Sequence, residues 1–328
     1  MTVNFRTLVS PLDFRGMINH STPMLSLGSC FAANIGSRLE KELFDVEVNP
    51  LGTLYNPASI YTVIYKIATE AMFVAPGDIV ERDGMRHCWL CHSSLSSPEP
   101  EQVYVERLND MAAVLRRKIA NVQVAVLTFG TRHVYRLKSD NSIVANCHKM
   151  PASFFAESDL SLHDCESYIC RTVEALRSLN PAMKIILTVS PVRYVGEGLH
   201  RSTLGKATLL LACEAVTRAF SDVIYFPSYE IMMDDLRDYR FYAADMKHPS
   251  EVAVDYIYDI FAESFFDKAT RDLAVKASRL SARMAHRNIC AASEATASFQ
   301  AKTLEMARRL SEEYPEVSQQ IMKHIQLP

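Results

Sequence analysis

The sequence lacks several features that would place it in common classes of protein. No apolar run approaches the roughly 18 residues that a membrane-spanning helix needs. Residues 1–10 also lack the basic start and apolar core of a secretory signal. The charge is balanced, with 35 Lys and Arg residues against 38 Asp and Glu residues, so no basic surface for nucleic acid is indicated. We therefore expect a soluble, cytoplasmic protein that binds neither membranes nor nucleic acids.

Other absences restrict the kind of site. Gly28 is followed only by Gly36, so the spacing of a phosphate-binding loop is missing. The segment His87–His92 contains one Cys-x-x-Cys pair but no second pair, and on a strand Cys88 and Cys91 would point to opposite faces. We expect neither a metal nor an organic cofactor. The eight cysteines are spread along the chain, which indicates reduced thiols instead of a disulfide framework.

The apolar residues that are present indicate an α/β protein. With 328 residues, 48% of them hydrophobic, the chain can bury a large core and carry an appendage. Helical spacing, as in Ile35, Leu39 and Leu43, separates short apolar runs. These runs indicate strands at residues 24–27, 46–48, 122–128, 184–190 and 223–226. The alternation predicts a three-layer, flavodoxin-like parallel sheet of about five strands, which would bind ligands beyond the carboxyl ends of its strands.

Two patterns depart from this alternation. Residues 79–92, with a turn at Asp83 and Gly84, and residues 134–147, with a turn at 139–141, read as hairpins that could wall a pocket. After residue 267 the strand pattern ends and helical spacing continues. We predict one domain over residues 1–266 and a helical extension over 267–328. These helices pack on the same domain, form a homodimer contact or offer a groove to a partner.

Ser29 is the candidate nucleophile. It follows the first predicted strand in Gly-Ser-Cys-Phe-Ala, residues 28–32, so its hydroxyl lies where the chain turns into a helix with unpaired N–H groups. A serine nucleophile needs a histidine to accept its proton and a carboxylate to orient that histidine. Asp245 precedes His248 by three residues, and Pro249 disfavours a helix at His248. In a turn, the carboxylate of Asp245 can therefore reach one nitrogen of the His248 ring.

Simpler interpretations exist for each of these residues. Ser29 could only cap its helix, His248 could be a surface histidine, and Asp245 could be a turn former. Cys30 is the rival nucleophile. Because a helix advances about 100° per residue, we expect Cys30 to face away from the cleft as a buried thiol if Ser29 faces it. If Ser29 only caps the helix, Cys30 at the helix start regains interest.

The pentapeptide at residues 28–32 resembles that of the GSCFA domain family, a branch of the SGNH/GDSL-like hydrolases. An Asp-x-x-His near the end of the domain is also similar. Further similar segments lie at strand or hairpin ends, at residues 49–52, 128–131, 144–149 and 188–193. The resemblance spans residues 24 to about 260. It implies an SGNH-type hydrolase domain over residues 1–266, in which Ser29, His248 and Asp245 form a catalytic triad.

The resemblance also implies an oxyanion hole, made of the N–H groups of Ser29 and Gly52. Many SGNH hydrolases add an asparagine amide from a Gly-x-Asn-Asp block after the third strand, but residues 130–133 here read Gly-Thr-Arg-His. Thr131 or Asn146 could replace that donor. One oxyanion donor contributes about 3 kcal/mol, against accelerations of roughly 8 kcal/mol or more, so its loss would slow catalysis without abolishing it.

The predicted substrate is an ester. His148, Arg193 and His200 stand on loops where they could bind an anionic or hydroxyl-rich part of it, with solvated surface charges as the alternative. The resemblance implies a serine esterase that removes a small acyl group, such as acetyl, from a carbohydrate or similar ester through an acyl-serine intermediate. An acyltransferase would use the same residues. A non-catalytic module that binds a glycan or acyl group, with a helical partner-binding tail, is the alternative from another class.

Overall fold

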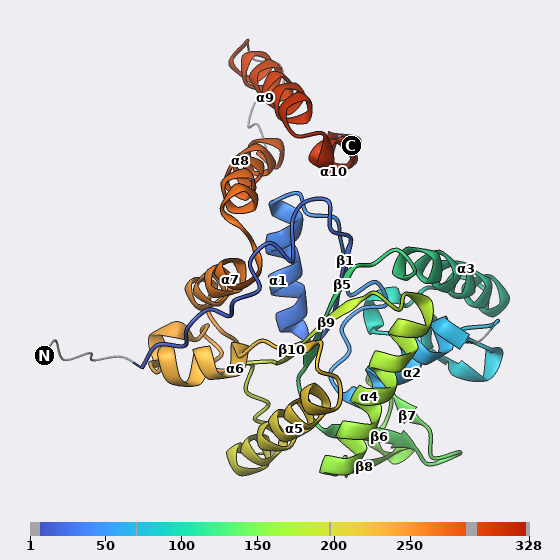
Figure 1. The fold of residues 1–328 in the computed structure, drawn as a ribbon. Helices are drawn as coiled ribbons and strands as arrows, with labels where there is room; N and C mark the ends of the chain where they lie inside the picture. The colour runs from blue at the N-terminus through green and yellow to red at the C-terminus, as the bar shows by residue number, and fades with distance from the viewer. Residues whose placement is uncertain (1–6, 70, 197, 287–293, 326–328) are drawn as a thin grey trace, which may run out of the picture.

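The computed structural model describes residues 7–69, 71–196, 198–286 and 294–325. At its centre lies a parallel sheet in the order β10-β9-β5-β1-β2 (Figure 1). Its strands are β1 (Met24–Gly28), β2 (Val46–Val48), β5 (Val124–Phe129), β9 (Lys184–Val189) and β10 (Val223–Tyr225). All five predicted strands are therefore confirmed. Counted along the chain, the order is 2-1-3-4-5, a doubly wound order in which the winding reverses between β1 and β5.

Helices cover both faces of this sheet. One face carries α1 (Cys30–Lys41) and α7 (Glu251–Phe265). The other face carries α2 (Pro57–Thr69), α3 (Glu101–Ile119), α4 (Leu162–Leu179) and α5 (Leu199–Ala219). Alternation along the strands builds the two cores, because Met24 packs in the core beneath α1 and the next residue, Leu25, packs beneath α2–α5. The predicted three layers are confirmed.

Short helical turns lie in the connections. They are η1 (Pro76–Asp78), η2 (Ser93–Leu95), η3 (Ala152–Phe154), α6 (Ser228–Glu230), η4 (Ile231–Asp235), η5 (Tyr239–Phe241) and η6 (Pro315–Val317). The first predicted hairpin is present, formed by β3 (Ile79–Arg82) and β4 (Met85–Cys88) in antiparallel pairing.

The second predicted hairpin is part of a larger unit. β6 (His133–Leu137) pairs antiparallel with β7 (Ile143–Val144), as expected. It also pairs along its whole length with β8 (Phe155–Asp159), a strand that the sequence pattern did not indicate. We call β6, β7 and β8 the insertion sheet, since they lie between β5 and α4. Its small core contains Trp89 from the first hairpin, so the two excursions from the main sheet pack together.

The C-terminal residues are helical, as predicted. α8 (Lys268–Met284), α9 (Glu294–Glu313) and α10 (Ser318–Ile325) share a core that includes Leu43 after α1. The side chain of Asp267 caps α8 by accepting a hydrogen bond from the Thr270 N–H. In Figure 1 these helices extend away from the insertion sheet. None of the helices in the described residues combines the length and apolar composition that a membrane span requires.

Candidate active site

Ser29 is held by the junction between β1 and α1. Gly28 has a φ of +142°, and a Cβ at this position would lie 2.1 Å from the Thr128 carbonyl oxygen, so the close approach of β1 to β5 requires glycine. Ser29 is the N-cap of α1, and its Oγ accepts a hydrogen bond from the Phe31 N–H at 3.3 Å. The capping role considered for Ser29 is therefore present. Its position beside β5 also places it at a cavity.

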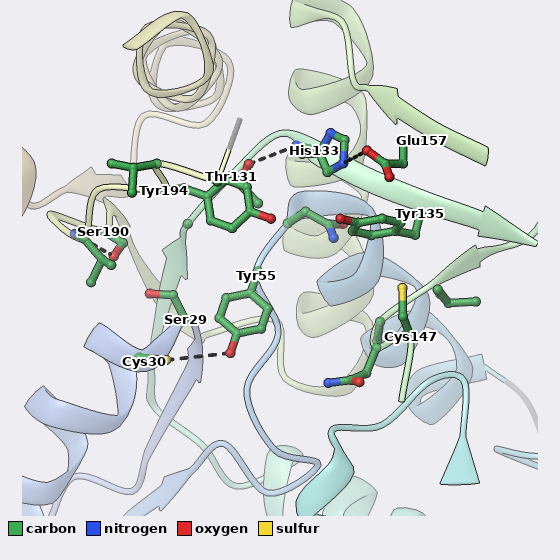
Figure 2. A pocket seen from close by; sticks show the side chains of 18 of the residues that line it. Ser29, Cys30, Tyr55, Thr131, His133, Tyr135, Cys147, Glu157, Ser190 and Tyr194 are labelled. Carbon is green, nitrogen blue, oxygen red and sulfur yellow. Dashed lines mark hydrogen bonds and ion pairs between the residues drawn. The ribbon is translucent and has the colours of Figure 1, made fainter. Parts of the chain in front are cut away.

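This cavity lies beyond the carboxyl ends of β1, β5 and β9. Its volume is about 730 Å³, within the usual range for small-molecule sites. Ser29 lines it together with residues from the loops after β5 and β9, from the insertion sheet and from the turn that carries His248. Figure 2 shows Ser29 and Cys30 on one side, with Tyr135, Cys147 and Glu157 on the other. The cavity thus occupies the place where the winding of a doubly wound sheet reverses, which is where such folds bind ligands.

Asp245 and His248 form the predicted pair. The carboxylate folds back within the turn, so that Asp245 Oδ2 and His248 Nδ1 are 2.6 Å apart. Asp245 Oδ1 accepts the backbone N–H groups of Lys247 and His248 at 2.9 and 3.0 Å. These three bonds hold the pKa of the Asp245 carboxyl well below its ordinary value, and the backbone N–H of His248 contributes most. The carboxylate therefore stays ionised and holds the imidazole ring in one orientation through Nδ1.

The other ring nitrogen of His248 is open. His248 lines the cavity, and among the described residues no group forms a hydrogen bond with its Nε2. The hydrogen bonds of those residues also include none between His248 and Ser29 Oγ. The structure thus brings the hydroxyl and the imidazole to one cavity without a direct bond between them. Their catalytic roles stay a prediction.

The two main-chain oxyanion donors are not available in this structure. The Gly52 N–H donates to the Asn49 carbonyl at 2.7 Å, and Gly52 does not line the cavity. Its φ of +78° and a clash of an added Cβ with His92 at 2.3 Å explain why a glycine stands there. The Ser29 N–H donates to the Thr128 carbonyl at 3.1 Å, continuing the pairing of β1 with β5. The assignment of Gly52 and Ser29 as oxyanion donors does not fit this geometry.

Two other donors at the cavity lack partners. The Cys30 N–H belongs to the first residue of α1, and no described residue accepts a hydrogen bond from it. Asn56 is 6% exposed and caps α2, because its Oδ1 accepts the Ser59 N–H at 2.8 Å. Within the described part of the chain its Nδ2 has no acceptor, and Asn56 lines the cavity. Asn56 before Pro57 is a readable helix-start signal, but nothing in the sequence places it near Ser29.

Backbone hydrogen bonds fix the loop that carries Asn56. The Leu54 N–H donates to the Gly28 carbonyl at 2.9 Å, at the end of β1. The Tyr55 carbonyl accepts the N–H groups of Gly130 and Thr131 at 2.8 and 3.0 Å, just beyond the end of β5. The loop is therefore fastened to both strands that flank the reversal point, which fixes the backbone on which Asn56 stands.

The two side chains predicted to replace the missing asparagine both line the cavity. Thr131 Oγ1 accepts the His133 N–H at 3.0 Å, an interaction drawn in Figure 2. Asn146 Oδ1 accepts the His148 N–H at 2.8 Å and the Ser93 hydroxyl at 3.2 Å. Both side chains are thus held through their oxygen atoms, and their role as oxyanion donors stays a prediction.

Only one of the three predicted substrate-binding residues lines the cavity. Arg193 lines the cavity. His148 does not line it, because it is buried with Nε2 bonded to the Cys88 carbonyl at 2.7 Å and Nδ1 near the Ser93 hydroxyl at 3.2 Å. Burial lowers the pKa of His148 to about 4, so it is a neutral structural residue at pH 7. His200 lies exposed in the first turn of α5, outside the cavity. The assignments of His148 and His200 to substrate binding are wrong for this cavity.

Cys30 also departs from the prediction. It is half-buried and lines the cavity, with its Sγ 3.7 Å from the Tyr55 hydroxyl. The argument from helical rotation failed because Ser29 is a cap with φ −69° and ψ 176°, which is extended backbone. The rotation of about 100° per residue applies only between residues that are both helical.

One buried cation beneath the cavity gave no signal in the sequence. Lys206 of α5 is 2% exposed, and its Nζ donates to the carbonyls of Gly130 at 2.7 Å and Ser190 at 2.6 Å. These two residues follow β5 and β9 and line the cavity. Burial lowers the pKa of Lys206 to about 7. The lysine therefore ties together two loops that shape the cavity.

Metal ligands are not gathered in the part of the chain that the structure describes. No group of three or more His, Cys, Asp or Glu side chains is placed there to hold a metal ion. Cys88 and Cys91 are both buried free thiols.

Comparison with known protein families gives a match to the GSCFA family over residues 23–261, which is well over half of the 328 residues. The matched region begins just before β1 and ends within α7, so it contains Ser29, Asp245 and His248. A comparison with curated proteins found no match.

Proposed function

We propose that this chain, which belongs to the GSCFA family, is a serine esterase with an SGNH-type fold. One observation carries the proposal: Ser29 and His248, whose ring is paired with Asp245, line the same cavity at the reversal point of a doubly wound sheet. The chain order of the residues, serine after the first strand and Asp-x-x-His before the last helix of the domain, agrees with that type of fold. We propose a carboxylic ester as substrate.

In the first step, Ser29 Oγ attacks the ester carbonyl carbon while His248 Nε2 accepts the hydroxyl proton, directly or through one water. The carbonyl π electrons move to oxygen, which becomes the oxyanion. We assign its stabilisation to the Cys30 N–H and the Asn56 amide, two donors of lining residues for which the described residues provide no acceptor. Asp245 holds the ring tautomer with the proton on Nδ1, so that Nε2 can act as the base.

Collapse of the tetrahedral intermediate breaks the bond between the carbonyl carbon and the alcohol oxygen, and His248 gives its proton to the leaving alcohol. Water then attacks the acyl-serine while His248 accepts a proton from it. The second collapse releases the carboxylic acid and returns the proton to Ser29. An acyltransferase would differ only in replacing this water with the hydroxyl of an acceptor. The acetylated carbohydrate implied by the resemblance is the starting substrate for assays.

A second function has a specific observation in its favour. The hydroxyl of Ser29 is engaged in capping α1 and has no hydrogen bond to His248 within the described residues. A binding module that keeps the cavity for a glycan or acyl ligand would show this arrangement without needing to change it. Reactivity of Ser29 separates the two functions.

The decisive experiment is covalent labelling with a fluorophosphonate, which reacts with activated serines. We expect the wild-type protein to be labelled, Ser29→Ala and His248→Ala to lose labelling, and Cys30→Ala to keep it. Cys30→Ala is the matched control, because Cys30 is the adjacent residue at the same cavity. No labelling of the folded wild type favours the binding module. Labelling that survives in Ser29→Ala places the nucleophile elsewhere.

A further inference from the structure

The cavity is much larger than the acetyl group that the resemblance implies. Its volume of about 730 Å³ lies in the upper part of the range for sites that enclose whole drug-sized ligands. An acetyl group on Ser29 would have only one carbon beyond the carbonyl. The space away from Ser29 therefore needs an occupant, and the residues that line this space indicate its chemistry.

Three phenol rings lead from Ser29 across the cavity; we call Tyr55, Tyr194 and Tyr135 the tyrosine row. The Tyr55 hydroxyl lies 3.7 Å from Cys30 Sγ, next to the nucleophile. Tyr194 lies close enough to both other rings that its phenol contributes to raising the pKa of Tyr55 and of Tyr135. In Figure 2, Tyr55 and Tyr194 lie between Ser29 and Tyr135. Burial raises the pKa of Tyr55 and of Tyr135, so the row offers neutral aromatic surface.

Beyond this row, the insertion sheet and its loops provide an apolar wall. The lining side chains there include Val144, Ala145, Met150, Ala152 and Phe155. Val144 and Phe155 also belong to the small core around Trp89, which makes this wall a rigid, packed surface.

Most charged residues that line the cavity lie outside the insertion sheet. Glu157 is the acidic side chain among the described lining residues, and its carboxylate lies 3.5 Å from His133 Nε2. The remaining basic lining side chains, Arg193 and Lys247, come from the loop after β9 and from the turn that carries the proposed base. Apart from Glu157, whose side chain is 57% exposed to solvent, and its neighbour His133, the described lining residues of the insertion sheet and its loops are uncharged.

We infer that the tyrosine row and the apolar wall bind the acyl part of the substrate, and that this acyl part is an apolar group of medium length instead of acetyl. This inference rests on the proposed esterase function, because it assigns the acyl side of the ester to this space. Each methylene that the wall buries strengthens binding in both the bound ester and the transition state, which raises kcat/KM.

The test is a series of p-nitrophenyl esters from acetate to decanoate, in which only the acyl chain changes. We expect kcat/KM to rise by about fourfold per added methylene until the chain fills the cavity, and then to fall. A profile that is flat, or highest for acetate, while hydrolysis still depends on Ser29 overturns the inference and leaves the esterase intact. A preference that follows the alcohol instead of the acyl chain also overturns it.

Matched variants locate the effect. Ala145→Phe places a ring in the apolar wall, and we expect it to lower kcat/KM for octanoate esters by about tenfold or more relative to its effect on acetate esters. Ala156→Phe is the control, since Ala156 lies on β8 between Phe155 and Glu157 but does not line the cavity. If Ala145→Phe does not fold, Ala152→Phe fills the cavity from an exposed position. Equal effects of the lining and control variants overturn the assignment.

Direct binding separates this inference from the proposed function. Calorimetry with Ser29→Ala compares octanoate and acetate as ligands and needs no catalysis. We expect octanoate to bind at least about tenfold more tightly than acetate, and Ala145→Phe in the same background to remove the difference. If every ester assay fails but octanoate still binds more tightly than acetate, the esterase function is refuted and the apolar binding site is supported. Equal affinities for the two acids refute the apolar site.

Discussion

The two halves of the candidate site differ in how far they are assembled. The half that holds His248, the proposed base, is complete, because Asp245 makes three hydrogen bonds within its turn and leaves His248 Nε2 without a partner among the described residues. In the half that holds Ser29, the proposed nucleophile, the hydroxyl caps a helix and the Ser29 N–H pairs with β5. The base half is built from four consecutive residues, whereas the nucleophile half depends on strands and loops that are distant in the sequence. Local chemistry is therefore readable from sequence, and non-local donor assignments are not.

Breaking the base half has the largest expected effect. Asp245→Asn keeps an oxygen to accept the two backbone N–H groups but presents an amide N–H to the ring. The ring must then accept at Nδ1 and carry its proton on Nε2, which removes the base. We expect kcat to fall by about 10⁴-fold with little change in the thermal unfolding midpoint. Steady-state kinetics on an ester that wild type cleaves would measure this. Full activity in Asp245→Asn would show that the pair is only a turn.

On the nucleophile half, Cys30→Pro deletes one backbone N–H. Proline is favoured at the first residue of a helix, and the extended backbone of Ser29 is compatible with a following proline. We expect kcat to fall by about 10² to 10³-fold with KM nearly unchanged, because the donor acts on the oxyanion. Cys30→Ala keeps the N–H and is the matched control, with a change below about threefold. Equal kinetics of the two variants would remove the Cys30 N–H from the oxyanion hole.

Asn56→Ser tests the second proposed donor. Serine preserves the cap of α2 but lacks the amide that lies open to the cavity, so the fold should persist while the oxyanion loses a partner. We expect kcat to fall by about 10²-fold. Asn56→Ala, which removes both features, should in addition lower the free energy of unfolding by about 1 kcal/mol. Unchanged kcat in Asn56→Ser would return attention to Thr131 and Asn146.

Lys206→Met tests the lysine that joins the loops after β5 and β9. The Gly130 and Ser190 carbonyls lose their ammonium donor, and we expect the free energy of unfolding to fall by about 1–3 kcal/mol. Since burial lowers the pKa from 10.5 to about 7, the folded state releases a proton that the unfolded state keeps. The free energy of unfolding of wild type should therefore rise from pH 7 towards 10.5 by up to about 1.4 kcal/mol per pH unit relative to Lys206→Met. Denaturant unfolding at several pH values measures this difference. The same pH dependence of the free energy of unfolding in both proteins would contradict the prediction.

The main sheet could be predicted because each strand carries its own apolar signal and each helix its own spacing. β8 was missed since its sequence, Phe-Ala-Glu-Ser-Asp, is short and half polar, and only its pairing with β6 makes it a strand. The wrong prediction for Cys30 has a similar cause. Whether Cys30 faces the cavity depends on the capping geometry of Ser29, which the spacing of residues in the sequence does not reveal.

In the site, the Asp245–His248 contact followed from spacing alone. The Gly52 assignment did not hold, because a glycine at positive φ serves a turn as readily as an oxyanion hole, and its hydrogen bond to Asn49 decides the matter. Asn56 and Lys206 were missed for a related reason. One is a helix cap and the other a single lysine in a helix, and only the packing of distant strands brings them to the cavity.

One backbone hydrogen bond links the recognition of a ligand to the position of the base. The Arg193 N–H donates to the Lys247 carbonyl at 3.1 Å, so the loop that carries Tyr194 is attached to the residue before His248. An acyl group that displaces the Tyr194 ring would pull on the imidazole through this attachment. Ligand length and proton transfer would then be mechanically linked, and a chain-length preference would appear in the turnover number as well as in affinity.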